Sequence, residues 1–178
     1  MKAVKDILKA NKDRKIIILP VGVSGSGKTF FYRELSKEFD IGYISFDRIR
    51  IQEFLKNKKI KKKDRDIYRE AYRFVNENRI KLLPIAKRQL KNSNKNIIYI
   101  DNTNLTKKAR NKFLCEADGY IKIGIFFKTD IDTCIKRQFL SSRDKFVSPK
   151  IIKEQFSVLQ EPTFDEFDII ARYEGNHR

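Results

Sequence analysis

The sequence predicts an α/β sandwich in which helices flank a five-stranded parallel sheet. Short apolar runs that are typical of buried strands recur five times, at residues 16–19, 41–46, 97–101, 120–127 and 168–173. Segments with helical spacing of apolar residues lie between these runs, and such crossovers are what parallel strands require. A glycine-rich loop at residues 22–29 joins the first run to the first crossover helix.

The chain is expected to form one domain over residues 1–178. It is 40% hydrophobic, and 178 residues are enough for one core but too few for two ordinary domains. Its 40 Lys and Arg exceed its 23 Asp and Glu, which gives a formal net charge of +17. Such a surface attracts polyanions, but an AT-rich genome also produces heavy use of Lys. The charge therefore favours a nucleic-acid partner only modestly.

Cysteine usage and hydropathy indicate the expected location of the protein. Cys115 and Cys134 are far apart in the sequence, so neither a C-x-x-C metal site nor a disulfide framework is indicated. No window reaches 18 uninterrupted apolar residues, and residues 1–11 lack the apolar stretch of a signal peptide. We expect a reduced, intracellular and cytoplasmic setting without membrane association.

The first part of the chain predicts a short helix and then a βαβ unit. Apolar residues three and four apart indicate an amphipathic helix at residues 4–10. After the glycine-rich loop, the apolar side chains of residues 30–39 share one helical face, and this helix is expected to end near Asp40. The run at residues 41–46 then supplies the second strand.

Residues 22–29 read Gly-Val-Ser-Gly-Ser-Gly-Lys-Thr and fit the P-loop pattern G-x-x-x-x-G-K-[ST]. Glycines let the backbone fold tightly enough for several N–H groups to converge on a phosphate chain. Lys28 would reach the β- and γ-phosphates, and the Thr29 hydroxyl would hold Mg²⁺. An ordinary Gly/Ser turn is the less favoured alternative. The residues expected to bind ATP or another NTP are Gly22, Ser24, Gly25, Ser26, Gly27, Lys28 and Thr29.

Asp47 and Arg50 follow the carboxyl end of the second predicted strand. In open parallel sheets the ligand lies outside these strand ends, so Asp47 would face the same cleft as the phosphate loop. Its carboxylate could accept the proton of an attacking hydroxyl or orient that hydroxyl, while Arg50 could pair with a substrate phosphate. The alternative has about equal support: Asp47 caps the following helix and Arg50 is solvated.

The middle of the chain, residues 48–94, is the least readable stretch. Residues 56–65 form an almost purely basic run, which is usually a solvated loop or a helix end. Helical spacing extends over residues 67–90, and Pro84 should kink or restart the helix. Basic and aromatic residues alternate at residues 68–74, which could stack single-stranded nucleic acid, but core packing is the favoured interpretation.

The strand predicted at residues 97–101 ends in Asp101, in the place of a Walker-B-type metal ligand. Asn102 and Asn104 then lie in a turn toward a helix for which Thr106 is a suitable N-cap. Small polar side chains after a buried strand suggest that Asn102 and Asn104 hold a polar substrate. Ordinary turn chemistry is the alternative.

Arg137 and Arg143 flank the end of a helix predicted at residues 131–140. Guanidinium groups offer bidentate hydrogen bonds to phosphoryl oxygens. Residues 137–148 could therefore form a lid that clamps the phosphates of the donor.

Together these features resemble the kinase domain of the polynucleotide kinases that heal nucleic-acid ends, in its viral and metazoan form. The resemblance covers nearly the whole chain except the basic middle stretch. It rests on the phosphate loop, Asp47 and Arg50, residues 101–104, Arg137 and Arg143, and the closing segment at residues 160–169.

The resemblance implies that Asp47 is the general base, that Arg50 contacts the acceptor phosphate, and that Arg137 and Arg143 contact the donor from the lid. It also implies that the strand before the phosphate loop lies near the centre of the sheet. The closing segment departs from the family because no glycine separates its acid from its Phe. The phosphatase signature D-x-D-x-T is absent as well, so a kinase alone is implied.

The expected function is transfer of the γ-phosphoryl group of ATP to the 5′-hydroxyl end of RNA or DNA, with Mg²⁺ held by Thr29 and Asp101. Two alternatives stay open. The chain could phosphorylate a small molecule, such as a nucleoside, a metabolite or an antibiotic, because related small-molecule kinases share the Asp-x-x-Arg and the closing segment. It could also be a nucleic-acid-binding module that holds NTP without productive chemistry.

Overall fold

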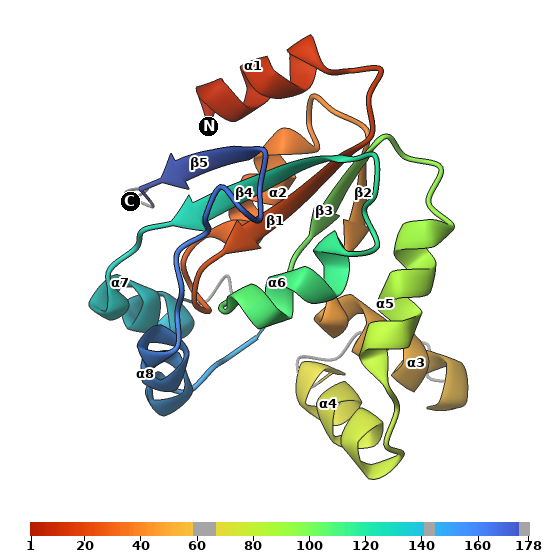
Figure 1. The fold of residues 1–178 in the computed structure, drawn as a ribbon. Coiled ribbons are helices and arrows are strands. Elements are labelled where there is room, and N and C mark those ends of the chain that lie inside the picture. Colours follow the sequence, from red (N-terminus) through yellow and green to blue (C-terminus); the bar gives the residue numbers. More distant parts are fainter. Residues whose placement is uncertain (59–66, 141–144, 175–178) are drawn as a thin grey trace.

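A computed structural model describes residues 1–58, 67–140 and 145–174 and builds them around a five-stranded parallel sheet (Figure 1). The order of the strands is β2-β3-β1-β4-β5, so β1, which precedes the phosphate loop, lies at the centre. The predicted fold class is confirmed. The strands are β1 (Ile16–Val21), β2 (Ile41–Ile44), β3 (Ile97–Ile100), β4 (Ile121–Phe127) and β5 (Ile169–Tyr173).

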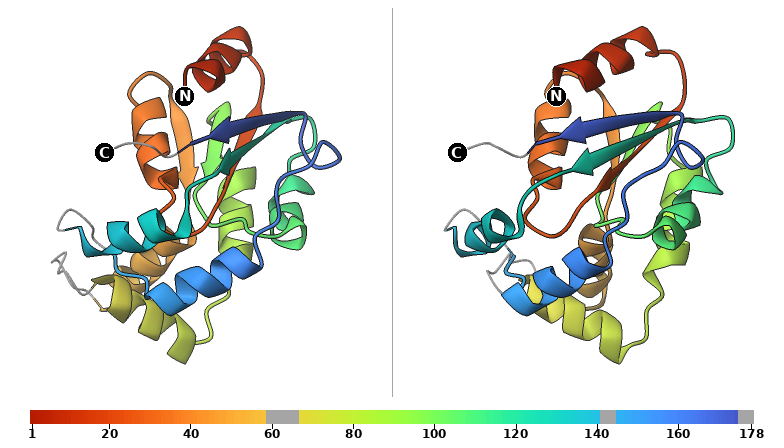
Figure 2. Two further views of the ribbon diagram at one scale, coloured as in Figure 1. Left: turned by 90° about the vertical axis from the view of Figure 1, so that its left-hand side faces the viewer. Right: turned by 60° about the vertical axis from the view of Figure 1, so that its left-hand side comes forward.

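The helices connect these strands and lie on both faces of the sheet (Figure 2). The part of the basic run beyond residue 58 lies outside the described residues. The helices are α1 (Lys2–Ala10), α2 (Lys28–Leu35), α3 (Phe46–Lys58), α4 (Ile67–Glu77), α5 (Leu82–Lys91), α6 (Lys107–Leu114), α7 (Ile131–Lys136), the 3₁₀ helix η1 (Arg137–Phe139) and α8 (Pro149–Ser157).

Two apolar cores sandwich the sheet because alternate residues of each strand point to opposite faces. In β1, Ile16 and Ile18 pack against α1 and α2, whereas Ile17 and Leu19 pack against α5 and α6. The left panel of Figure 2 shows α2 on one side of the sheet and α5 and α6 on the other. β1 is buried along its whole length, as a central parallel strand must be.

The remaining helices gather beyond the carboxyl ends of the strands (Figure 1). α3 and α4 form one pair, joined by apolar contacts of Phe54 with Ile67 and Ala71. α7 and α8 form the other pair, around buried Cys134 and Ile152. These two pairs therefore flank the strand ends from which the phosphate loop and the turn after β3 emerge.

Some element boundaries differ from the sequence predictions. α2 ends at Leu35 instead of near Asp40, because hydrogen bonds from the N–H groups of Glu38 and Phe39 to the Leu35 carbonyl turn the chain. The helical spacing at residues 67–90 is divided between α4 and α5, and the break contains Arg79 with φ of 51°. Pro84 lies in the first turn of α5, where its missing N–H is not needed.

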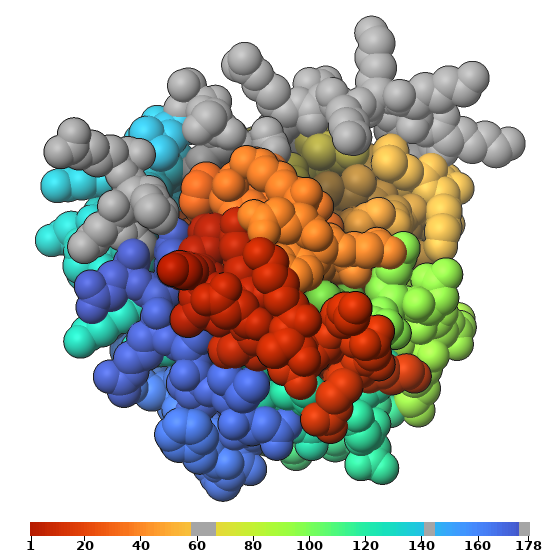
Figure 3. Space-filling view, turned by 90° about the horizontal axis from the view of Figure 1, so that it is seen from above, coloured from red at the N-terminus to blue at the C-terminus, as the bar shows by residue number. Residues whose placement is uncertain are grey.

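α1 lies beside α2 at the top of the molecule, where Figure 3 shows the N-terminal segment in red across the surface. Its Val4 and Leu8 are buried in the core that α2 shares with the sheet, as expected for the apolar face of the predicted amphipathic helix. Among the described residues, no helix combines the length and the apolar character needed to cross a bilayer.

Candidate active site

The phosphate loop leaves the end of β1 and enters α2 through glycines that no other residue could easily replace. Gly25 and Gly27 have φ of 90° and 105°, in the left-handed region that favours glycine. A Cβ at Gly25 would also lie 2.5 Å from the Cys134 carbonyl oxygen of α7. At Gly22, a Cβ would lie 2.8 Å from the Ser26 hydroxyl. The loop is thus packed closely against itself and against α7.

Lys28 opens α2, and its ammonium group is folded back over the loop. Its Nζ donates to the carbonyl oxygens of Gly22 at 2.9 Å and Val23 at 2.7 Å, and to Ser26 Oγ at 3.3 Å. These partners are neutral, so an anionic phosphate oxygen would be a stronger acceptor for the same ammonium. Ser26 is fully buried within the loop, and Ser24 donates its backbone N–H to Gln155 of α8 at 2.8 Å.

Thr29 and Asp101 meet where α2 begins and β3 ends. Thr29 Oγ1 donates to Asp101 Oδ2 at 2.7 Å, and the Tyr43 hydroxyl donates to the same oxygen at 2.6 Å. Burial raises the pKa of Tyr43, and the Asp101 charge raises it further, so this phenol stays protonated as a donor. Tyr43 was not identified from the sequence, because nothing in the spacing along the chain links it to Asp101.

The pair of Thr29 and Asp101 fits a magnesium ion that arrives with a nucleotide. Mg²⁺ commonly takes one or two protein oxygens and completes its shell with phosphate oxygens and water. Where the chain is described, no cluster of three or more His, Cys, Asp or Glu could hold a metal by itself. The donor set is therefore suited to Mg²⁺ bound together with phosphates, rather than to a metal held by the protein alone.

Asp47 lies in the first turn of α3, but it does not cap the helix. The cap hydrogen bonds come from Ser45 Oγ, which accepts from the Arg48 N–H at 3.3 Å, and from Asn102 Oδ1, which accepts from the Phe46 N–H at 3.0 Å. The Asp47 carboxylate is left for other partners. The cap interpretation of Asp47 is therefore wrong.

Two cations hold the Asp47 carboxylate, one on each oxygen. Arg50 Nη1 donates to Oδ1 and Lys145 Nζ donates to Oδ2, both at 2.6 Å. The Arg50 guanidinium also lies 5.4 Å from the centre of the exposed Tyr72 ring, and its Nε is buried without a hydrogen-bond partner among the described residues. Lys145 was missed by the sequence analysis because its contact with Asp47 spans 98 positions.

Asn102 and Asn104 both build the turn after β3. Asn104 is buried with φ of 50°, and its Nδ2 donates to the carbonyl oxygens of Pro20 at 2.8 Å and Ile100 at 3.0 Å. These carbonyls occupy its Nδ2, so that group stabilises the turn, and the expected contact of Asn104 with the substrate stays a prediction. The Asn102 Nδ2 is different: it is buried and has no hydrogen-bond partner in the described part of the chain.

The lid prediction can be followed only in part. Arg137 lies in η1, directly after α7, and its Nη1 donates to the Gly25 carbonyl oxygen at 3.1 Å. It therefore contacts the phosphate loop itself. Arg143 lies outside the described residues. Lys145 and Phe146 resume the described chain, which continues to the N-cap Ser148 of α8.

The closing segment is tied to the turn after β3 by Arg110 of α6. The side chains of Arg110 and Glu166 are 1% and 4% exposed, and the two lie 2.7 Å apart. Arg110 also donates to the carbonyl oxygens of Asn104 at 3.2 Å and Gln160 at 2.9 Å. Next to this pair, the Phe167 ring packs against Gly124. A Cβ at position 124 would lie 2.9 Å from the Cδ2 atom of that ring.

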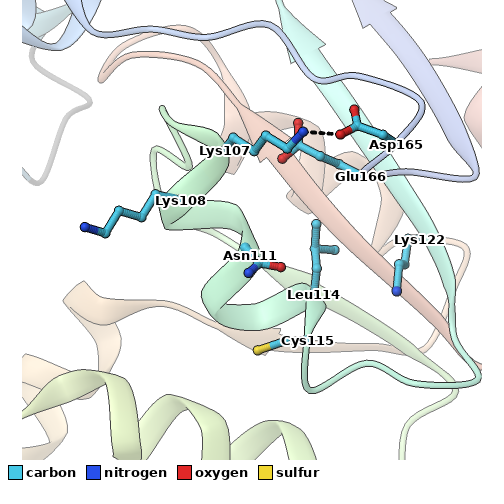
Figure 4. Close-up of a pocket in the computed structure, with 8 residues that line it drawn as sticks. All are labelled: Lys107, Lys108, Asn111, Leu114, Cys115, Lys122, Asp165 and Glu166. Atoms are coloured by element: carbon cyan, nitrogen blue, oxygen red, sulfur yellow. Dashed lines mark hydrogen bonds and ion pairs between the residues drawn. The ribbon is translucent and has the colours of Figure 1, made fainter.

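Two surface hollows lie outside the phosphate loop. One, of about 350 Å³, lies between α6 and the closing segment, where Lys107 pairs with Asp165 (Figure 4). The other, of about 400 Å³, lies along β2, with Arg48 and Arg88 in its lining. Neither is lined by Lys28 or Asp47, so both hollows lie apart from the candidate active site at the carboxyl ends of the strands.

Comparisons with known proteins agree with this architecture. Residues 17–162 match the model of the family described as AAA domain. A gluconokinase from Sinorhizobium meliloti 1021 is similar in structure, with a TM-score of 0.59 and 16% identity over 93% of this chain and 86% of that chain. A sugar kinase from Janibacter sp. HTCC2649 has a TM-score of 0.58 and 15% identity over 92% and 87%. A search of curated proteins found no match.

At these identities the likeness is one of fold alone, a kinase-like α/β fold in which helices flank a five-stranded parallel sheet. Both of these solved structures carry the names of small-molecule kinases. The narrower resemblance to polynucleotide kinases therefore rests on the sequence motifs alone.

Proposed function

The chain belongs to the AAA domain family, and from this premise we propose that it is an ATP-dependent kinase that phosphorylates a hydroxyl group. The observation that carries the proposal is the Asp47 carboxylate, which no helix cap requires. It follows β2 at the same edge of the parallel sheet where β1 leads into the phosphate loop and β3 into Asp101. A donor and an acceptor of the phosphoryl group would meet at that edge.

In the proposed reaction, the acceptor oxygen forms a bond to the γ-phosphorus, and the bond from that phosphorus to the bridging oxygen breaks, so that ADP leaves. Asp47 takes the proton of the acceptor hydroxyl. Arg50 and Lys145 each donate to one Asp47 oxygen, and each oxygen keeps a second lone pair that can accept the proton of the acceptor hydroxyl.

The donor side relies on Lys28, the loop N–H groups and the N-terminus of α2, which all favour a phosphate chain. Thr29 and Asp101 would hold Mg²⁺, which neutralises charge between the β- and γ-phosphate oxygens. Arg137 donates a hydrogen bond to the Gly25 carbonyl oxygen of the loop. If it exchanged this carbonyl for a phosphate oxygen, its guanidinium would bind the phosphates of the donor.

A small-molecule acceptor is our first candidate. It is supported by the two solved kinases, named for gluconate and sugar phosphorylation, whose fold spans more than nine-tenths of this chain. An acceptor of this kind is rich in hydroxyl groups. The buried Asn102 Nδ2 and Arg50 Nε, which lack hydrogen-bond partners among the described residues, are donors that such oxygens could satisfy.

A 5′-hydroxyl end of RNA or DNA is the second candidate. The formal net charge of +17 supports it, since each cation near the site would raise the affinity for a polyanionic acceptor. The exposed Tyr72 ring beneath Arg50 also offers a surface on which a terminal base could stack.

The test is transfer of label from γ-labelled ATP to a panel of acceptors. The panel contains sugars and sugar acids, free nucleosides, and oligonucleotides with 5′-hydroxyl ends. Label on one class of acceptor, dependent on Mg²⁺, would support the kinase and identify its acceptor. Binding of ATP with no label on any member would favour a module that holds NTP without chemistry.

A further inference from the structure

Tyr43 lies on the edge strand β2, yet its hydroxyl reaches the end of the neighbouring strand. Its hydrogen bond to Asp101 Oδ2 measures 2.6 Å, and Thr29 Oγ1 donates to the same oxygen at 2.7 Å. Donors from β2 and α2 therefore converge on one carboxylate oxygen at the end of β3. This arrangement goes beyond the phosphate-loop pattern, which requires only Thr29 and an acidic residue.

The Tyr43 ring is held in place by its neighbours. The Tyr32 ring of α2 packs against it with ring centres 4.3 Å apart and planes tilted by 37°. The Arg48 guanidinium lies 5.9 Å from its centre. Since these contacts restrict the ring, its hydroxyl offers a fixed point to which the Asp101 carboxylate is attached.

The hydrogen bond to Asp101 determines in which direction the Thr29 hydroxyl presents its lone pairs. A threonine hydroxyl has one proton and two lone pairs. Because its proton is committed to Asp101 Oδ2, the lone pairs of Thr29 point away from Asp101 and are available to a cation. If the Asp101 carboxylate rotated, the Thr29 hydroxyl would turn with it, and its lone pairs would lose that direction.

We propose that Tyr43 is a positioning residue that holds the Asp101 carboxylate in the orientation in which Thr29 presents its lone pairs to the Mg²⁺ of a bound nucleotide. The inference rests on the proposed function, because the Mg²⁺–ATP complex is the ligand concerned. Partners that orient metal-binding groups from behind typically change metal affinity about 10- to 100-fold when removed.

The experiment measures binding of a fluorescent ATP analogue while the Mg²⁺ concentration is varied, with no acceptor present. Tyr43→Phe removes only the hydroxyl, and we expect it to need about 10-fold more Mg²⁺ for half-maximal binding. Binding of the analogue in EDTA should not change, because Lys28 and the loop are untouched. Tyr32→Phe is the matched control: it alters the other ring of the stack, whose hydroxyl does not contact Asp101, and should leave the Mg²⁺ requirement unchanged.

A second comparison separates positioning from general stability. In an Asp101→Ala background, adding Tyr43→Phe should produce no further change in the Mg²⁺ requirement, since Tyr43 acts through Asp101. An additional change there, an unchanged Mg²⁺ requirement in Tyr43→Phe alone, or equal changes in both phenylalanine variants would overturn the inference. Failure of the wild-type protein to bind the analogue with Mg²⁺ would instead contradict the proposed function and the inference with it.

Discussion

At the residue scale, Asp47 is the side chain for which the helix-cap and the general-base interpretations predict the most different results. Arg50 and Lys145 hold its oxygens, while Ser45 and Asn102 cap the helix in whose first turn it lies. Because Asp47 does not cap α3, its substitution should have little effect on the stability of that helix. Its replacement by an amide of the same shape therefore reports on chemistry more than on folding.

Asp47→Asn should keep the thermal stability and the nucleotide affinity and lose phosphoryl transfer. The two ion pairs that it breaks are partly exposed, with the Asp47 side chain 34% exposed, so their loss should cost no more than about 1 kcal/mol. Loss of the proton acceptor should lower kcat by roughly 10²-fold or more. Label transfer and thermal unfolding measure the two effects.

Ser45→Ala is the matched variant for this test. It removes a cap hydrogen bond at the same helix end and should lower the free energy of unfolding by about 1 kcal/mol. Its kcat should stay close to that of the wild type. Asp47→Asn activity within a few-fold of wild type would exclude Asp47 as the base.

At the scale of elements, Arg110 explains why the closing segment lies against the turn after β3. Its guanidinium donates to Glu166 and to backbone carbonyls of residues 104, 105, 160 and 161, all from within the interior. Burial would raise the pKa of Glu166, but the hydrogen bonds and charge of Arg110 outweigh it and hold that pKa below its ordinary value. The pair thus joins the closing segment to the turn after β3, and that turn borders the candidate active site.

Arg110→Met should lower the free energy of unfolding by about 3 kcal/mol or more, because it leaves the Glu166 carboxylate and several carbonyls buried without their donor. Lys107→Met, one turn away in α6, breaks an exposed pair with Asp165 and should cost less than about 1 kcal/mol. Urea unfolding measures both values. Equal losses in the two variants would contradict the structural role of the buried pair.

The pH dependence gives a second measurement on the same pair. Because Glu166 has a lowered pKa in the folded protein, its contribution is complete above the pKa of the unfolded carboxyl, about 4.3, and is lost as the pH falls through the folded value. Arg110→Met should remove this loss of stability on acidification. An identical acid profile in the two proteins would show that Glu166 does not depend on Arg110.

At the scale of the whole molecule, the sheet and the loop could be predicted because their signals are local. Each strand is an apolar run, and the P-loop glycines stand in one stretch of eight residues. The sequence could not predict three other contacts, those of Tyr43 with Asp101, Lys145 with Asp47, and Arg110 with Glu166. The two residues of each contact lie 58, 98 and 56 positions apart along the chain. Such contacts form only once the folded chain brings distant segments together.

The net charge is also a property of the whole molecule, and salt tests what it does. The affinity for a 5′-hydroxyl oligonucleotide should fall steeply as salt is added, because binding releases counterions from the phosphates. Hydrolysis of ATP without acceptor, and the KM for an uncharged sugar, should change far less. An oligonucleotide affinity that does not respond to salt would show that the +17 charge does not serve a polyanion.

The central claim is that the strand-end edge transfers the γ-phosphoryl group of ATP, and Lys28 tests it most directly. The measurement compares label transfer from γ-labelled ATP by wild-type protein and Lys28→Ala, at saturating Mg²⁺ and with the acceptor found in the panel. The ammonium neutralises charge on the β- and γ-oxygens in the transition state, so kcat should fall by about 10²-fold or more while thermal unfolding shows an intact fold. Near-normal turnover in Lys28→Ala would contradict the phosphate-loop mechanism.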